Sequence, residues 1–134
     1  MRQLIFALIV LILNGCTAYD AFLMGKFDNA EYLMITEIRT DSARYALQCD
    51  DAVVSKTNAT FIANKITLFM NYSEKLSNNT DTYNAAKSLN DIGQGLQLRY
   101  ASAVPVTPLY CKLKFQIIEH SSETMQHVLG NRPK

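Results

Sequence analysis

The chain has 134 residues, 49% of them hydrophobic, which predicts one domain with a core of modest size. Thirteen Lys and Arg residues against twelve Asp and Glu residues give a formal net charge of +1. The charges are balanced and the sequence has no long basic run, so the chain lacks the basic patch that is typical of a nucleic-acid-binding protein. We therefore expect no nucleic acid among the partners.

Residues 1–16 carry the signature of export. A positive start at Arg2 is followed by an apolar run from Leu4 to Leu13. At about 1.5 Å per residue this run would be about 15 Å long as a helix, roughly half of a membrane span, so a signal peptide is the better interpretation. The run ends in Leu13-Asn14-Gly15-Cys16, which resembles the lipobox of bacterial lipoproteins.

The lipobox resemblance implies a signal peptide over 1–15, a single mature domain over 16–134, and diacylglycerol and palmitate on Cys16. Thr17 stands where an aspartate would commonly retain a lipoprotein in the inner membrane. The resemblance therefore implies anchoring in the outer membrane, facing the periplasm. The alternative is an ordinary secretory signal cleaved after Ala18, with Cys16 discarded.

Two cysteines, Cys49 and Cys111, remain in the mature chain. An even pair in an oxidising compartment predicts a disulfide. A catalytic thiol is the alternative, but it would need an electropositive setting, and Asp50 and Asp51 follow Cys49 directly. We therefore predict a Cys49–Cys111 disulfide and no catalytic cysteine.

Apolar residues that recur every three or four positions predict two amphipathic helices in the first half of the mature chain, over 19–48 and 59–76. Residues 50–58 are expected to form a loop, with Thr57 or Asn58 as the N-cap of the second helix. Polar residues such as Glu31 are expected on outer faces. The predicted core positions are Leu23, Phe27, Ala30, Met34, Ile38 and Tyr45 in the first helix, and Ile62, Ile66, Phe69 and Leu76 in the second.

Two further helices are predicted over 82–101 and 109–129. Gly93 and Gly95 weaken the third helix by about 1 kcal/mol each relative to alanine, and they suggest a kink or a close helix contact. Thr107 followed by Pro108 predicts the N-cap and first residue of the fourth helix, which Gly130 ends. The predicted core positions are Ala85, Leu89, Ile92, Leu96 and Tyr100, then Cys111, Phe115, Ile118, Met125 and Leu129.

The predicted fold class is all-α: a small antiparallel four-helix bundle after the lipoprotein signal peptide. In an up-down-up-down order the first helix ends, and the fourth begins, at the same end of the bundle. This topology brings Cys49 and Cys111 together, so the predicted fold and the predicted disulfide are consistent.

One group of residues on the fourth helix is a candidate for chemistry. His120, Glu123 and His127, with Glu119 beside them, are spaced to share one side of the helix and could gather a metal ion. The apolar stripe points away from this side, so we interpret the group as a solvated charged face. We expect no metal, no cofactor, no small-molecule substrate and no enzymatic activity; a small metal-binding protein or enzyme is the alternative.

Together with the lipobox, the stretches 27–32 (FDNAEY), 37–40 (EIRT) and 125–134 (MQHVLGNRPK) resemble small lipoproteins of tailed phages. This resemblance implies a lysis factor, as the outer-membrane half of a spanin, or a superinfection exclusion factor. The chain departs from proline-rich spanin partners, because it has three prolines and none in a PxxP linker.

The leading functional hypothesis is a non-enzymatic, membrane-anchored periplasmic lipoprotein that binds an envelope protein of unknown identity. Glycosylation sequons occur at Asn58, Asn71 and Asn78. A secreted glycoprotein is therefore an alternative to the lipoprotein hypothesis.

Overall fold

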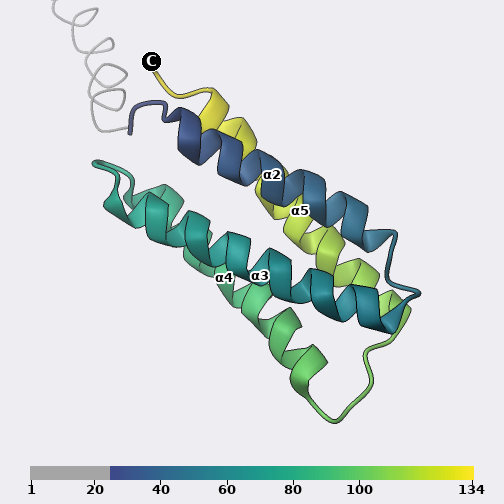
Figure 1. The fold of residues 1–134 in the computed structure, drawn as a ribbon. Coiled ribbons are helices and arrows are strands. Elements are labelled where there is room, and N and C mark those ends of the chain that lie inside the picture. Colours follow the sequence, from purple (N-terminus) through teal and green to yellow (C-terminus); the bar gives the residue numbers. More distant parts are fainter. Residues whose placement is uncertain (1–24) are drawn as a thin grey trace, which may run out of the picture.

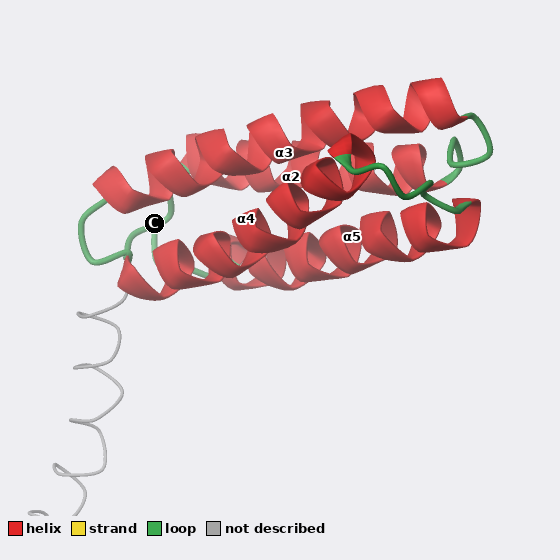
Figure 2. Ribbon diagram, turned by 90° about the horizontal axis from the view of Figure 1, so that it is seen from below, coloured by secondary structure: helices red, strands yellow, loops and turns green. Residues whose placement is uncertain are grey.

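The computed structural model describes residues 25–134, which form a bundle of four helices (Figure 1). These are α2 (Asn29–Ala46), α3 (Ala52–Lys75), α4 (Thr80–Ala101) and α5 (Pro108–Gly130). Successive helices run antiparallel, and α5 returns to lie beside α2 (Figures 1 and 2). The predicted all-α four-helix bundle is confirmed. The predicted signal peptide and Cys16, the predicted site of lipid attachment, lie outside the described residues.

The bundle consists of two closely packed antiparallel pairs, α2 with α5 and α3 with α4, stacked against each other. Apolar side chains from all four helices fill the space between the pairs, and burying each contributes roughly 1.5–3 kcal/mol. The largest completely buried apolar side chains are Phe69, Phe115, Ile35, Ile38, Ile62, Ile66, Leu89, Leu96, Ile118 and Leu129. Within residues 25–134, no helix combines the length and the apolar character that a membrane span requires.

Helix α5 follows the sequence prediction closely. Its N-cap is Thr107, whose hydroxyl accepts the N–H of Tyr110 at 3.2 Å, and Pro108 occupies the first turn. All of its predicted core positions are buried: Cys111, Phe115, Ile118, Met125 and Leu129.

The start of α2 corrects the sequence prediction. Residues 25–28 are not helical, and the helix begins at Asn29 because the Asp28 carboxylate accepts the N–H of Glu31 at 2.8 Å. This bond satisfies one of the amides that a helix start leaves free. The predicted helical residues 19–24 lie outside the described part of the chain.

The buried face of α2 also differs from the predicted one. The buried positions of this helix are Glu31, Ile35, Ile38, Ser42, Tyr45 and Ala46. The predicted core residues that are only half buried are Phe27, Ala30 and Met34. The prediction that Glu31 lies on an outer face is wrong, since its exposed fraction is 0%.

Helix α3 begins earlier than predicted. The carboxylate of Asp51 accepts the N–H groups of Val53 and Val54 at 2.9 and 3.0 Å, so residues predicted as a loop form the first turns of the helix. The predicted cap Asn58 instead lies inside the helix, where its side-chain amide donates to the Gln48 side chain at 2.7 Å. Of the predicted core positions, Leu76 alone is only half buried.

Helix α4 confirms the close helix contact predicted at one of its two glycines. A Cβ on Gly93 would lie 2.9 Å from the Cδ1 of Ile66 on α3, whereas a Cβ on Gly95 would meet nothing within 4 Å. Gly93 therefore permits the tight approach of α3 and α4. The predicted core residue Ala85 is exposed, and its neighbour Ala86 is buried instead.

Candidate functional site

The two ends of the bundle differ in chemistry. We call the end that holds the α2–α3 connection and the start of α5 the disulfide end. Cys49 and Cys111 meet there with a Cα–Cα distance of 5.8 Å, within the usual range for a disulfide, and their sulfurs are bonded. The predicted pairing is thus confirmed. Both residues are buried, with Cys49 packed near Tyr45, so the disulfide joins the α2–α3 connection to the first turn of α5 at the edge of the core.

The histidines of α5 lie on the solvent face, as predicted. The side chain of His120 is 78% exposed, and its Nδ1 lies 3.5 Å from a carboxylate oxygen of Glu123. His127 lies near the Asn131 amide, further along the helix. In the described part of the chain, no three His, Cys, Asp or Glu side chains are grouped so that they could hold a metal ion.

The opposite end, which we call the entry end, contains Gly25, the α3–α4 turn and residues 131–134. At its centre lies the completely buried carboxylate of Glu31. Its Oε1 accepts hydrogen bonds from the Ser73 hydroxyl at 2.7 Å and the Asn79 amide at 2.6 Å, and its Oε2 lies 3.1 Å from Nη1 of Arg132. A buried charge requires such partners, and this one receives them from three separate segments.

Arg132 closes this cluster from the C-terminal side. Its exposed fraction is 8%, and its second guanidinium nitrogen donates to the Thr82 hydroxyl of α4. Immediately beyond it, the carbonyl of Pro133 accepts the N–H of Phe27 at 2.8 Å. The segments before α2 and after α5 are therefore bound to each other and to the α3–α4 turn.

A second carboxylate supports the same end of the bundle. Asp28, the N-cap of α2, also accepts a hydrogen bond from the Tyr72 hydroxyl of α3 at 3.1 Å. The pKa of the Tyr72 hydroxyl is raised, first by desolvation and then by this bond to a carboxylate. The contact ties the start of α2 to the last turns of α3.

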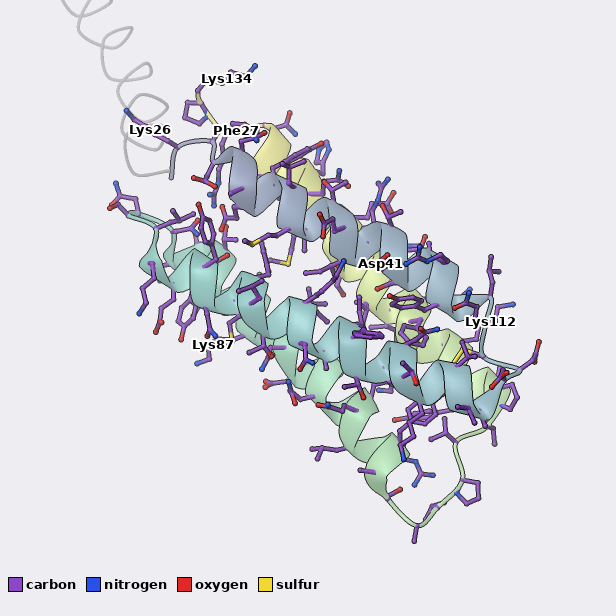
Figure 3. The ribbon with its side chains drawn as sticks, viewed as in Figure 1. Lys26, Phe27, Asp41, Lys87, Lys112 and Lys134 are labelled. Carbon is purple, nitrogen blue, oxygen red and sulfur yellow. A yellow bond between two sulfur atoms is a disulfide. The ribbon has the colours of Figure 1, made fainter. Side chains whose placement is uncertain are left out.

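A pocket of about 480 Å³ opens beside the buried cluster at the entry end. This volume falls within the range of small-molecule sites, roughly 300–1,000 Å³. The residues that line the pocket are Lys26, Phe27, Asp28, Leu76, Ser77, Asn78, Asn79, Arg132, Pro133 and Lys134. Figure 3 shows Lys26, Phe27 and Lys134 together at this end of the molecule, far from Lys112 at the disulfide end.

Helix α3 carries an apolar stripe on its outer side. Val54, Phe61 and Leu68 are spaced seven residues apart and are 38%, 56% and 59% exposed. A hollow of about 390 Å³ adjoins the stripe, lined by Phe61, Leu68, Tyr45, Asn64 and Lys65. Other exposed apolar side chains occur on α5, at Leu109, Leu113 and Ile117.

The charged residue that lines this hollow, Lys65, is already paired. The ammonium of Lys65 lies 2.6 Å from the carboxylate of Asp41 and 3.1 Å from that of Glu37, both on α2. The hydrogen bond with Asp41 is the main reason that the pKa of Lys65 is raised, and it outweighs the opposing effect of desolvation. The cluster links α2 to α3, and because Arg44 also pairs with Asp41 at 2.6 Å, its two cations and two carboxylates balance.

The three sequons differ in accessibility. Asn58 is 7% exposed and bonded to Gln48, so a glycan there is incompatible with the folded bundle. Asn71 and Asn78 are exposed.

No protein-family model, curated protein or solved structure matches this chain. The Glu31–Arg132 cluster and its pocket are not predictable from local sequence, because their parts come from three distant segments with no shared motif.

Proposed function

We propose that this protein is a lipid-anchored lipoprotein of the outer membrane, facing the periplasm, that binds a helical segment of another envelope protein and has no enzymatic activity. The observation that carries the proposal is the exposed stripe of Val54, Phe61 and Leu68 on α3. The lipobox supports the anchor, and the disulfide suits an oxidising compartment.

The spacing of the stripe favours a helix as the bound element. A coiled-coil seam has two apolar positions in every seven residues, and the stripe supplies one of them while Thr57, Asn64 and Asn71 occupy the other. Aromatic residues, phenylalanine among them, are enriched in protein interfaces, and Phe61 lies at the centre of this stripe beside a hollow. We expect an apolar side chain of the partner to fill that hollow.

The surroundings of the stripe indicate the chemistry of the partner. Thr57, Asn64 and Asn71 flank it with uncharged polar side chains, and Lys65 on the other border is paired within the bundle. A partner therefore gains little from opposite charge here. An amphipathic helix with an apolar stripe and neutral polar flanks fits this surface best.

The test is site-specific photo-crosslinking in cells that express the full chain. A photoreactive residue replaces Phe61 or Leu68, and the matched control position is Leu98, an isolated exposed leucine on α4 that is 68% exposed. We expect one discrete adduct from positions 61 and 68, absent from position 98. The Cys16→Ala variant should lose it, because its uncleaved precursor is no longer lipid-anchored in the outer membrane.

A second substitution makes the test specific. Val54→Ser removes part of the stripe without touching the crosslinking position, so it should weaken the adduct formed from Leu68. Equal adducts from all three positions would contradict the proposal. An adduct of twice the mass of the chain would show self-association through α3 in place of a distinct partner, and would overturn it as stated.

A further inference from the structure

Helix α5 carries a second apolar stripe, which the proposed function does not use. Leu109, Leu113 and Ile117 are spaced four residues apart and are 67%, 50% and 45% exposed. Residues at this spacing share one face of a helix, and the core residues Phe115 and Ile118 occupy the opposite face. We call the three exposed residues the α5 stripe. Single exposed apolar residues are common, but three in line on one outer face are typical of an interface.

Two charged residues flank the α5 stripe on the same side. Lys112 and Glu119 are seven residues apart, so they lie one above the other along the helix. Lys112 is exposed and Glu119 is half-buried. Within residues 25–134 neither of them takes part in an ion pair, so both charges are available to a second molecule.

This order of charges is complementary to itself when two copies of α5 run antiparallel. Lys112 of each copy then faces Glu119 of the other, whereas a parallel pair would set the two Lys112 side chains against each other. The two-fold axis of the antiparallel pair also brings Leu113 of each copy against Ile117 of the other. Both contacts are centred near Phe115, so a single register satisfies the apolar residues and the charges.

We propose that a second copy of this chain docks on the α5 stripe and forms an antiparallel dimer with two-fold symmetry. The stripe is short, so the interface is smaller than that of a typical stable complex, and we expect a Kd above about 1 μM. Attachment of both copies to one membrane would raise their local concentration and favour such a weak dimer.

The position of α5 leaves α3 accessible in this dimer. Helix α5 packs against α2 and α4, and α3 lies diagonally across the bundle from it (Figure 2). The apolar stripes of the two α3 helices therefore face away from the dimer interface. The dimer offers two such surfaces to an envelope partner, and bivalent binding is tighter without any new contact; this consequence rests on the proposed function. Under the proposed lipid anchor, both copies reach one bilayer when the bundles lie along its surface.

Charge reversal tests the interface. Sedimentation equilibrium of the full chain, with detergent micelles in excess, measures the dimer fraction against protein concentration. Lys112→Glu and Glu119→Lys should each weaken dimerisation at least about tenfold, because both charge contacts of the dimer then join like charges. An equimolar mixture of the two variants should dimerise as the parent chain does, because each contact in the mixed dimer again joins opposite charges.

Matched variants on α4 provide the controls. Lys87→Glu reverses an exposed charge away from α5 and should change dimerisation less than about twofold (Figure 3). Leu113→Ser should weaken dimerisation at least about tenfold, because its side chain packs twice in the symmetric interface. Leu98→Ser changes an isolated leucine that is 68% exposed and should have no effect. None of these side chains is buried in the bundle, so all the variants should keep the circular dichroism spectrum of the parent chain.

Three results would overturn the proposal. A parent chain that stays monomeric at about 1 mM has no such interface. Single charge reversals that dimerise like the parent chain, or a mixture that does not restore dimerisation, would contradict the antiparallel register. Dimerisation that is lost with Phe61→Ser and kept with Leu113→Ser would mean that self-association uses α3. The first two results leave the photo-crosslinked adduct of α3 with an envelope partner unaffected, so failure of the dimer is distinguishable from failure of the proposed function.

Discussion

Nη1 of Arg132 lies 3.1 Å from Oε2 of Glu31, an ion pair between residues separated by 101 positions in the chain. It joins the first turn of α2 to the segment that follows α5. At the other end of the bundle, the disulfide joins the α2–α3 connection to α5. The α2–α5 pair is therefore fastened at both ends, by a buried ion pair at one and by a covalent bond at the other.

Because this ion pair is buried, we predict that removing one partner greatly lowers the free energy of unfolding. Arg132→Met leaves the carboxylate of Glu31 buried without its cation, and such losses typically destabilise a protein by about 3–5 kcal/mol. Urea unfolding followed by circular dichroism should show this decrease in the free energy of unfolding. Arg132→Met combined with Glu31→Gln should be less destabilised than Arg132→Met alone, because the uncompensated charge is gone. If the single variant retained the stability of the parent chain, the cluster would not be organised by charge.

We predict that the disulfide also contributes strongly to the free energy of unfolding. Cys49 and Cys111 are separated by 62 positions, and closing a loop of this length stabilises a fold by about 4 kcal/mol in the chain-entropy model. Cys49→Ser with Cys111→Ser should lower the free energy of unfolding by about this amount. Reductant should destabilise the parent chain and leave the double variant unchanged. Alkylation of two free thiols in the native protein would contradict the pairing.

The sequence predicts α5 better than α2, and the reason is physical. In α5 every predicted core position is buried. With the exception of Ser122, the side chains that face the interior of the bundle are apolar, so the apolar period marks the buried face. In α2 the interior includes Glu31, and local periodicity cannot place a carboxylate in a core when its cation lies beyond α5. The candidate site at the entry end shares this difficulty, since Asn79 and Arg132 acquire their roles only through tertiary contacts.

The beginning of α3 illustrates a different difficulty. Residues 50–58 are polar and lack an apolar period, so composition favours a loop. The signal that was present is Asp51, a good N-cap residue directly before helix-compatible residues. Ser55 and Asn58 are buried on the inner face of this first part of the helix, where small or hydrogen-bonded polar groups replace apolar ones.

The two faces of α5 predict opposite responses to truncation. Phe115 and Ile118 are completely buried, so replacing either with alanine should destabilise the protein by roughly 2–5 kcal/mol. His120→Ala and His127→Ala change exposed side chains and should alter stability by less than about 0.5 kcal/mol. Thermal unfolding of the four variants, with and without zinc, measures both effects. Stabilisation by zinc that disappears with either histidine would restore the metal-binding hypothesis.

The two glycines of α4 form a matched pair. Gly95→Ala introduces a methyl group into open space and should stabilise the helix by up to about 1 kcal/mol. Gly93→Ala gains the same helix propensity but must displace the buried side chain of Ile66, so its net gain should be smaller or negative. Thermal melts of both variants test the contact. Equal stabilisation would show that α3 and α4 are not tightly packed at Gly93.

The proposed attachment at the outer membrane is tested most directly by metabolic labelling with an alkyne analogue of palmitate, followed by mass spectrometry of the mature N-terminus. Cys49→Ser is the matched control for Cys16→Ser, since each removes one cysteine. We predict that the parent chain and the Cys49→Ser variant are labelled and begin at an acylated Cys16. The Cys16→Ser variant should be unlabelled and retain its signal peptide. Label on the Cys16→Ser variant, or a mature protein that begins at Tyr19, would contradict the anchor.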